Sequence, residues 1–413
     1  MDPLVVRQGV RGRDIPTGLC LAPSCGSRLH LRLKWTIRRM SITDHFGASQ
    51  SQTSSMSAPL AQGRAMDQDA LAGVRLWLWS IAALVFAMVV VGGATRLTES
   101  GLSITEWKVI SGVIPPLTDA AWLAEFEKYK QIPQYAQLFP TMDLSQFKSI
   151  FFWEWGHRLL GRIIGFAFAV PLVWFAIRGR LRGKLAWQCA GVLALGGLQG
   201  FVGWWMVSSG LTQRVEVAPE RLATHLLLAS ITFATVITIA VGLKPQRVVP
   251  AEPGLRRVGV ALVALVLLQI GLGALVAGGR AGLIYNTWPL MDGHFVPPLA
   301  HLTNLTPVWL NVLENVTLVQ FNHRMLAYTV MLVAGLHALQ VWRSDRSLKA
   351  IGSTPAALKR SLALAGLVSC QAVIGIITLL LAVPLWAGLL HQAFAMIVLA
   401  MATVHARLMF GRA

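Results

Sequence analysis

Eight apolar runs, each long enough to cross a membrane, follow one another from Leu76 onward. A membrane-spanning helix needs about 20 predominantly apolar residues, because the hydrocarbon core of a bilayer is about 30 Å thick. We therefore expect an all-α polytopic membrane protein. The last helix has the least distinct start, because Pro384 and Trp386 crowd the turn before it. The predicted helices cover 76–95, 151–177, 184–207, 222–243, 257–279, 321–342, 361–383 and 386–406.

Composition supports this interpretation. Hydrophobic residues make up 55% of the 413 residues and charged residues 13%, whereas soluble domains carry about 25% charged residues. A net charge of +18 would suggest a nucleic-acid partner for a soluble protein. Here the basic residues lie in short linkers between apolar runs, which is the positive-inside pattern of membrane proteins. The pattern indicates membrane lipid, and not nucleic acid, as the surrounding partner.

The linkers also predict the orientation of the helices. Those after the second, fourth and sixth runs are rich in Lys and Arg, whereas the linker over 96–150 has more acidic than basic residues. The linker after the fifth run has almost no charge beyond Arg280, Asp292 and Glu314. Because cytoplasmic loops carry the excess of Lys and Arg, both termini are expected in the cytoplasm. Every even-numbered helix then begins at the outer face.

Residues 1–70 form a basic and polar tail that differs from the rest of the chain. Eight Lys and Arg residues up to Arg39 precede a stretch rich in Ser, Gln and Ala. This composition resembles a transit peptide. Two other interpretations remain open: a disordered cytoplasmic tail, or an upstream start codon with the true start at Met40 or Met56. Whether residues 1–55 are translated or retained does not follow from the sequence.

The apolar part repeats itself, which predicts two tandem four-helix bundles over 71–243 and 244–413. Each half has an even number of helices, so the halves are expected to be parallel repeats about an axis along the membrane normal. A QxxxG pattern also recurs in the third and seventh runs, at 199–203 and 371–375. An offset of 181 residues relates Gly101, Leu102, Trp107 and Gly112 to Gly282, Leu283, Trp288 and Gly293.

Four of the ten histidines form a regular set. His157, His225, His323 and His391 are each expected within about two turns of the outer end of an even-numbered helix. The first pair and the second pair are both separated by 68 residues. Each half can therefore bring two imidazoles to one depth, as six-coordinate haem iron in a helical bundle requires. No Asp, Glu or Cys cluster joins them, as zinc or copper sites usually require.

Two more histidines leave an alternative open. His337 and His405 each follow a member of the set by 14 residues, which is about 21 Å along the same helix face. That spacing is typical of a second haem stacked across the membrane. Buried or interfacial histidines without a ligand are the competing interpretation, since the first half has Pro171 and Ile239 at the equivalent positions.

The motifs of this chain resemble those of the haem A synthase family. They are GGATRLTESGLS at 92–103, EWGHR at 154–158, RLATH at 221–225, FNHRM at 321–325 and LHQ at 390–392. The resemblance runs from about Arg75 to Arg407. One branch of the family has a cysteine pair in its first outer loop, and this chain has no Cys between Cys25 and Cys189. It is therefore similar to the other branch, of proteobacteria and mitochondria.

The resemblance implies an oxidoreductase of the bacterial inner membrane, or of the mitochondrial inner membrane if the tail is a transit peptide. Haem A synthases oxidise the C8 methyl of haem O to a formyl group by successive hydroxylations, with water as the expected oxygen source. Electrons leave through a bound haem b. Haem O synthase and cytochrome oxidase assembly factors are the implied partners, and a homo-oligomer remains open. How haem O arrives and what accepts the electrons are not implied.

An asymmetry between the halves predicts which haem each one holds. Glu154 lies three residues before His157, on roughly the same helix face, and Gln320 takes the equivalent position. A carboxylate accepts protons or orients water beside a reacting methyl, whereas an amide does not accept protons. We therefore expect substrate haem O between His157 and His225 with Glu154 as the catalytic group. Haem b is expected between His323 and His391.

Four arginines near the outer helix ends are candidates for contacts with the anionic haem propionates. Interface anchoring explains any one of them equally well. A competing function is a di-haem cytochrome that carries electrons between quinone and an outer partner. A transporter would need broken helices and a polar site at the midplane, and neither is seen in the sequence. The four arginines are Arg96, Arg158, Arg280 and Arg324.

Overall fold

The computed structural model describes residues 57–108, 110–244, 250–348 and 356–411. Of the tail predicted over 1–70, residues 1–56 lie outside the described residues. Helix α1 (Ser57–Leu97) begins ahead of the boundary predicted at residue 70. The contacts divide the chain into residues 1–57 and 58–413, and the fold given below is that of the second unit.

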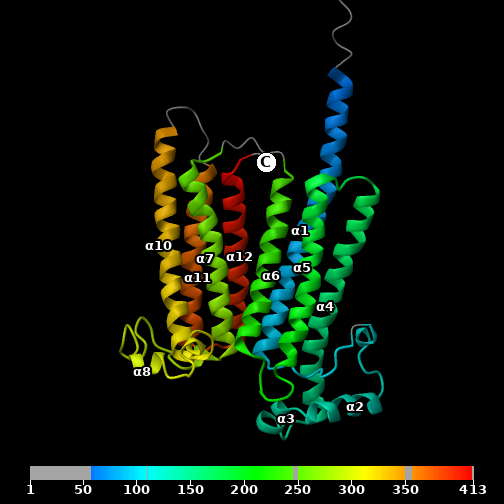
Figure 1. The fold of residues 1–413 in the computed structure, drawn as a ribbon, viewed down its shortest axis with the longest axis vertical. Helices are drawn as coiled ribbons and strands as arrows, with labels where there is room; N and C mark the ends of the chain where they lie inside the picture. The colour runs from blue at the N-terminus through cyan, green and yellow to red at the C-terminus, as the bar shows by residue number, and fades with distance from the viewer. Residues whose placement is uncertain (1–56, 109, 245–249, 349–355, 412–413) are drawn as a thin grey trace, which may run out of the picture. The chain divides into compact units, whose positions relative to one another are not determined.

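Eight helices of the described residues are long and apolar enough to span a membrane, as predicted. They run alongside one another in Figure 1, and the described residues form no β-strand. The first spans Leu71–Leu97 within α1. The others are α4 (Leu144–Ile177), α5 (Gly183–Ser208), α6 (Pro219–Gly242), α7 (Pro253–Gly278), α10 (Val316–Leu348), α11 (Ala356–Leu380) and α12 (Leu385–Met409).

Short helices occupy the two long linkers, and Figure 1 shows them gathered at one end of the eight long helices. We call this the loop end. Both the first turn of α1 and the last turn of α12 lie at the opposite end. The short elements are η1 (Ser111–Val113), α2 (Asp119–Lys130), α3 (Pro133–Leu138), η2 (Ala281–Leu283), α8 (Leu299–Leu302), η3 (Val308–Leu310) and α9 (Asn311–Glu314).

Helix α4 begins at Leu144, earlier than the apolar pattern predicts. Asp143 caps it: the Asp143 side chain accepts from the backbone N–H of Gln146, and the Gln146 side chain accepts from the backbone N–H of Asp143. This reciprocal capping box satisfies two backbone donors that the first turn would leave free. The added turns then bury Phe147 and Phe151 in an aromatic cluster with α2 at the loop end.

The two predicted halves share one core. A single cluster of buried apolar side chains takes residues from all eight long helices. Across the boundary between the halves, α6 packs against both α7 and α12. A second contact crosses the boundary between α12 and α1, where the Gln392 side chain donates to the Val89 carbonyl at 2.8 Å. The absence of a side chain at Gly93 makes room for Gln392, because a Cβ there would lie 2.0 Å from its Oε1.

Candidate haem-binding sites

The four histidines of the predicted set lie on α4, α6, α10 and α12. His225, His323 and His391 lie within two turns of the first residue of their helix, as predicted. The prediction was wrong for His157. Because α4 begins at Leu144, His157 lies about 20 Å along the helix at a rise of about 1.5 Å per residue. The extra turns depend on packing against α2, which an apolar-run pattern does not reveal.

A glycine on a neighbouring helix faces each of these imidazoles. A Cβ added to any of the four glycines would lie 2.7–3.1 Å from the ring. Carbon atoms pack best at about 3.5–4.0 Å, so only glycine lets the neighbouring backbone approach this closely. The resulting cradles are Gly92–His157, Gly203–His225, Gly273–His323 and Gly375–His391.

Three of the cradles also contain a glutamine, four residues before the glycine. Gln199, Gln269 and Gln371 each place their side-chain nitrogen 3.1 Å from the ring Nδ1 of their histidine, and 3.3–3.5 Å from Nε2. The same nitrogen donates to the backbone carbonyl of that histidine at 2.9–3.0 Å. The pair Gln269 and Gly273 was missed in the sequence, although it has the same QxxxG spacing as the two pairs that were noted.

The two rings of the second half are spaced to face one metal ion. The ring centroids of His323 and His391 are 6.5 Å apart. With metal–nitrogen bonds of about 2 Å, two imidazoles on opposite sides of one ion place their centroids roughly 6 Å apart. Imidazole is a common haem-iron ligand, and bundle cores hold such sites between facing helices. The spacing and the glycine cradles therefore fit a haem.

The pair His337 and His405 is arranged differently. Both side chains are buried, and their Nε2 atoms are 2.9 Å apart with ring centroids at 5.1 Å. This is a direct hydrogen bond, which leaves no space for an iron ion between the rings. The arrangement favours the interpretation of two buried histidines without a ligand, hydrogen-bonded to each other through Nε2, over that of a second, inner haem.

Glu154 lies beside the first pair, and four donors hold its carboxylate. Oε2 accepts from the Ser103 hydroxyl at 2.8 Å and from the Ile104 backbone N–H at 2.7 Å. Oε1 accepts two hydrogen bonds from Arg158, at 3.0 and 2.5 Å. Only 3% of the Glu154 surface is exposed. Because a carboxylate offers about four lone-pair positions, all of them are occupied in this arrangement, and the side chain is fixed in place.

Arg158 and Arg324, each directly after a histidine of the set, hold the two long linkers at the loop end. In both halves the two terminal nitrogens of the guanidinium donate to loop carbonyls two residues apart, at 2.8–3.0 Å. These donors therefore point at the loops that cover the loop end. The carbonyls belong to Ile104 and Glu106 for Arg158, and to Tyr285 and Thr287 for Arg324.

Arg96 and Arg280 meet at the boundary between the halves. Arg96 donates to Glu216 at 2.6 Å and to the carbonyl of Ala277 at 3.0 Å. Arg280 pairs with Glu99 at 2.5 Å and also with Glu216. Glu99 and Arg280 are 181 positions apart. They are therefore equivalent positions of the two halves, and they pair with each other across the boundary. The two arginines thus join the halves through an alternating network of charges.

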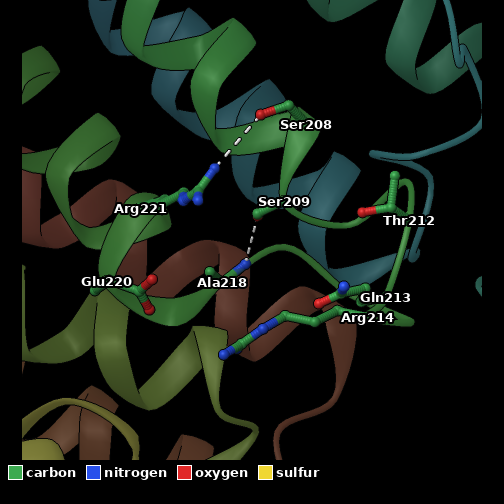
Figure 2. Close-up of a pocket in the computed structure, with 8 residues that line it drawn as sticks. All are labelled: Ser208, Ser209, Thr212, Gln213, Arg214, Ala218, Glu220 and Arg221. Carbon is green, nitrogen blue, oxygen red and sulfur yellow. Dashed lines mark hydrogen bonds between the residues drawn. The ribbon is translucent and has the colours of Figure 1, made fainter.

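A cavity of about 350 Å³ opens between the ends of α5 and α6 (Figure 2). Arg221, one turn before His225, donates to the Trp205 carbonyl at 2.8 Å and lies 3.4 Å from the Ser208 hydroxyl. Nearly all of the lining side chains are polar, whereas ligand pockets are lined mostly by apolar side chains. A porphyrin ring is largely apolar, so this cavity is not one of the haem sites. None of the site residues predicted from the sequence lines it.

Comparison with known proteins decides the family. The profile of the family described as cytochrome oxidase assembly protein matches residues 75–403. A haem A synthase of Beijerinckia indica is 60% identical over 335 residues, which cover 80% of this chain and 91% of that protein. This chain belongs to the haem A synthase family. Haem A synthases of Brucella ovis and Brucella anthropi are 54% identical, with 81% of this chain and 91% of theirs covered. The resemblance seen in the motifs is thereby confirmed.

Proposed function

We propose that this chain acts as a haem A synthase, an oxidoreductase that converts the C8 methyl of haem O to a formyl group. Each of two hydroxylations takes the oxygen of one water molecule and releases two protons and two electrons. The geminal diol that results loses one water to leave the formyl group. The observation that carries this proposal is the 60% identity to a haem A synthase over nearly the whole membrane part.

The first half is proposed to hold haem O between His157 and His225. Glu154 is the ionisable side chain that distinguishes this half, since Gln320 occupies the equivalent position. In the structure the Glu154 carboxylate lies three residues before His157 and is almost fully buried. Release of one of its four donors would let it orient water or accept a proton beside the methyl group.

The second half is proposed to hold haem b as the resident cofactor, between His323 and His391. Their 6.5 Å ring separation supports this assignment. When bound, haem b supplies one-electron transfer, by which the electrons released at the substrate leave the site. Gln320, in the place of Glu154, donates to the Tyr285 carbonyl at 3.2 Å and so fixes the loop without adding a charge.

We place the chain in the inner membrane of a bacterium with both termini in the cytoplasm, because basic linkers follow the even-numbered helices. The loop end then faces outward. Haem O synthase would supply the substrate, and assembly of cytochrome oxidase would consume the haem A. If residues 1–56 act as a transit peptide, the location becomes the mitochondrial inner membrane.

Conversion of haem in cells tests the proposal. The chain is expressed in a host that makes haem O but no haem A, and the extracted haems are separated by chromatography. Haem A should appear with the wild-type chain and be absent with the empty vector. A haem pool that stays unchanged, together with two haems b per purified chain, would support the di-haem cytochrome instead.

The role of Glu154 needs a separate test, because removing it also releases a loop. Glu154→Gln keeps hydrogen-bonding capacity and volume but removes the charge, and it reproduces the residue found in the second half. We expect it to abolish haem A formation while haem b stays bound. Ser103→Ala removes one donor and should retain most activity. Loss of haem b in Glu154→Gln would show that the haems are assigned to the wrong halves.

A further inference from the structure

The four histidines are not held equally. Behind three of the rings lies a glutamine amide of the neighbouring helix, at Gln199, Gln269 or Gln371. In the first half, the position equivalent to Gln269 is Met88, four residues before Gly92. A thioether offers only a weak acceptor and no N–H donor. Within the part of the chain that the structure describes, the ring of His157 accordingly has no hydrogen-bond partner.

The ring of His157 is also oriented differently. At the three cradles with a glutamine, the ring atom nearest to the added Cβ is Cε1, and Nδ1 is the nearer of the two nitrogens. At Gly92 the nearest ring atom is Nε2, at 3.0 Å. A half-turn of the ring relates the two orientations, because it exchanges Nε2 with Cε1. No amide fixes the ring in either orientation.

The glutamines carry a further sign of a ligand. In all three, the side-chain Oε1 is buried without a hydrogen-bond donor, and a buried polar atom without a partner is costly. When Nε2 of a histidine binds a metal, the ring proton lies on Nδ1 and needs an acceptor. A half-turn of the amide would place Oε1 opposite Nδ1, but it would also set this oxygen against the histidine carbonyl to which the amide nitrogen now donates. Each of the three cradles therefore contains a buried, unpartnered amide oxygen beside a ring whose Nδ1 the amide already contacts.

We infer that His157 is the exchangeable axial ligand of this protein, and that the glutamines are positioning residues that lock the other three. The bond to His157 is the last to form as haem O enters and the first to break as haem A leaves, and the bond to His225 breaks after it. Haem b, held by two locked histidines, stays in place through many turnovers. The inference rests on the proposed assignment of the substrate haem to the first half. Partners of this kind change metal affinity by about 10- to 100-fold.

A reciprocal exchange of side chains tests the inference. Met88→Gln supplies the missing amide behind His157, and Gln269→Met removes the one behind His323. Met88→Leu is the matched control, because it keeps an apolar side chain of similar size. Each protein is purified from cells that make haem O and is reduced, and carbon monoxide is added. Carbon monoxide binds only at an iron whose axial position becomes free, and the haem type at each site follows from extraction.

In the wild-type chain we expect carbon monoxide to bind the haem O or haem A fraction and not haem b. Met88→Gln should slow this binding about 10- to 100-fold and retain more haem O and haem A through purification. Gln269→Met should make haem b reactive, whereas Met88→Leu should behave as wild type. If Gln269→Met instead makes haem O reactive towards carbon monoxide, the glutamine does fix its histidine, but the haems are assigned to the wrong halves.

The inference fails if neither exchange alters carbon monoxide binding, or if Met88→Leu alters it as much as Met88→Gln. An amide at position 88 lies in an apolar helix and could prevent folding. Gln199→Met then serves as the second variant, because it removes the lock from His225 without adding a polar group. It should raise the carbon monoxide reactivity of the first-half haem, and unchanged reactivity would also contradict the inference.

Discussion

Replacing Gly375 with Ala tests the close approach of α11 to His391. The added Cβ would lie 2.7 Å from the ring Cε1, about 1 Å inside the optimum for two carbons. The ring has to move by a similar distance, whereas binding sites tolerate displacements of only about 0.5 Å. Overpacking of this kind costs about 1–3 kcal/mol, against a gain of about 1 kcal/mol from the higher helix propensity of Ala.

We therefore expect Gly375→Ala to fold but to lose most of its haem b. Haem b per purified chain is measured by pyridine haemochrome, and thermal unfolding followed by circular dichroism checks the fold. Gly273→Ala, whose Cβ would lie 3.1 Å from His323, should lose less haem b. The matched control is Gly366→Ala on the same helix, where a Cβ meets nothing within 4 Å. Full haem b with an unchanged spectrum in Gly375→Ala would refute the cradle argument.

Three further predictions concern the loops and the inner pair. Arg324→Ala leaves the Thr287 carbonyl without a donor, whereas that of Tyr285 keeps the one from Gln320. It should lower the free energy of unfolding by about 1–3 kcal/mol, measured as a shift in the thermal midpoint. His337→Phe should leave the haem content per chain unchanged, and a loss of haem would show that the inner pair binds one. Hydrogen bonds from Lys108 and then Lys128 lower the pKa of Glu106 below its ordinary 4.5. These hydrogen bonds contribute fully to the free energy of unfolding above pH 4.5, and their contribution is lost as the pH falls through the lowered pKa of Glu106. The higher stability of the wild-type chain relative to Glu106→Gln should therefore vanish in acid.

The helices and their repeat could be predicted from the sequence because each depends on local composition. An apolar run of about 20 residues has few structural solutions in a bilayer. The spacing of 68 residues, at equivalent positions of both halves, selected four histidines from ten. The presence of a glutamate at 154 and a glutamine at 320 could also be read directly. These features can be predicted because they are properties of single segments or of their spacing along the chain.

The contacts between segments could not be predicted in this way. Arg96 lies near the end of α1, but the sequence does not show that Glu216 meets it from the linker before α6. The early start of α4 depends on aromatic packing with α2, and the direct contact of His337 with His405 depends on the distance between two helices. The glutamine behind His323 has a local signal, the QxxxG spacing, but its meaning emerges only when α7 is packed against α10.

The central claim is that the two pairs of histidines hold two different haems. The most direct measurement is the type and amount of haem in purified His225→Ala and His391→Ala, each made in cells that supply haem O. The account predicts that His225→Ala keeps haem b and loses haem O and haem A, and that His391→Ala loses haem b and keeps haem O. Loss of the same haem type from both variants, or retention of haem O in His225→Ala with loss of haem b, would contradict it.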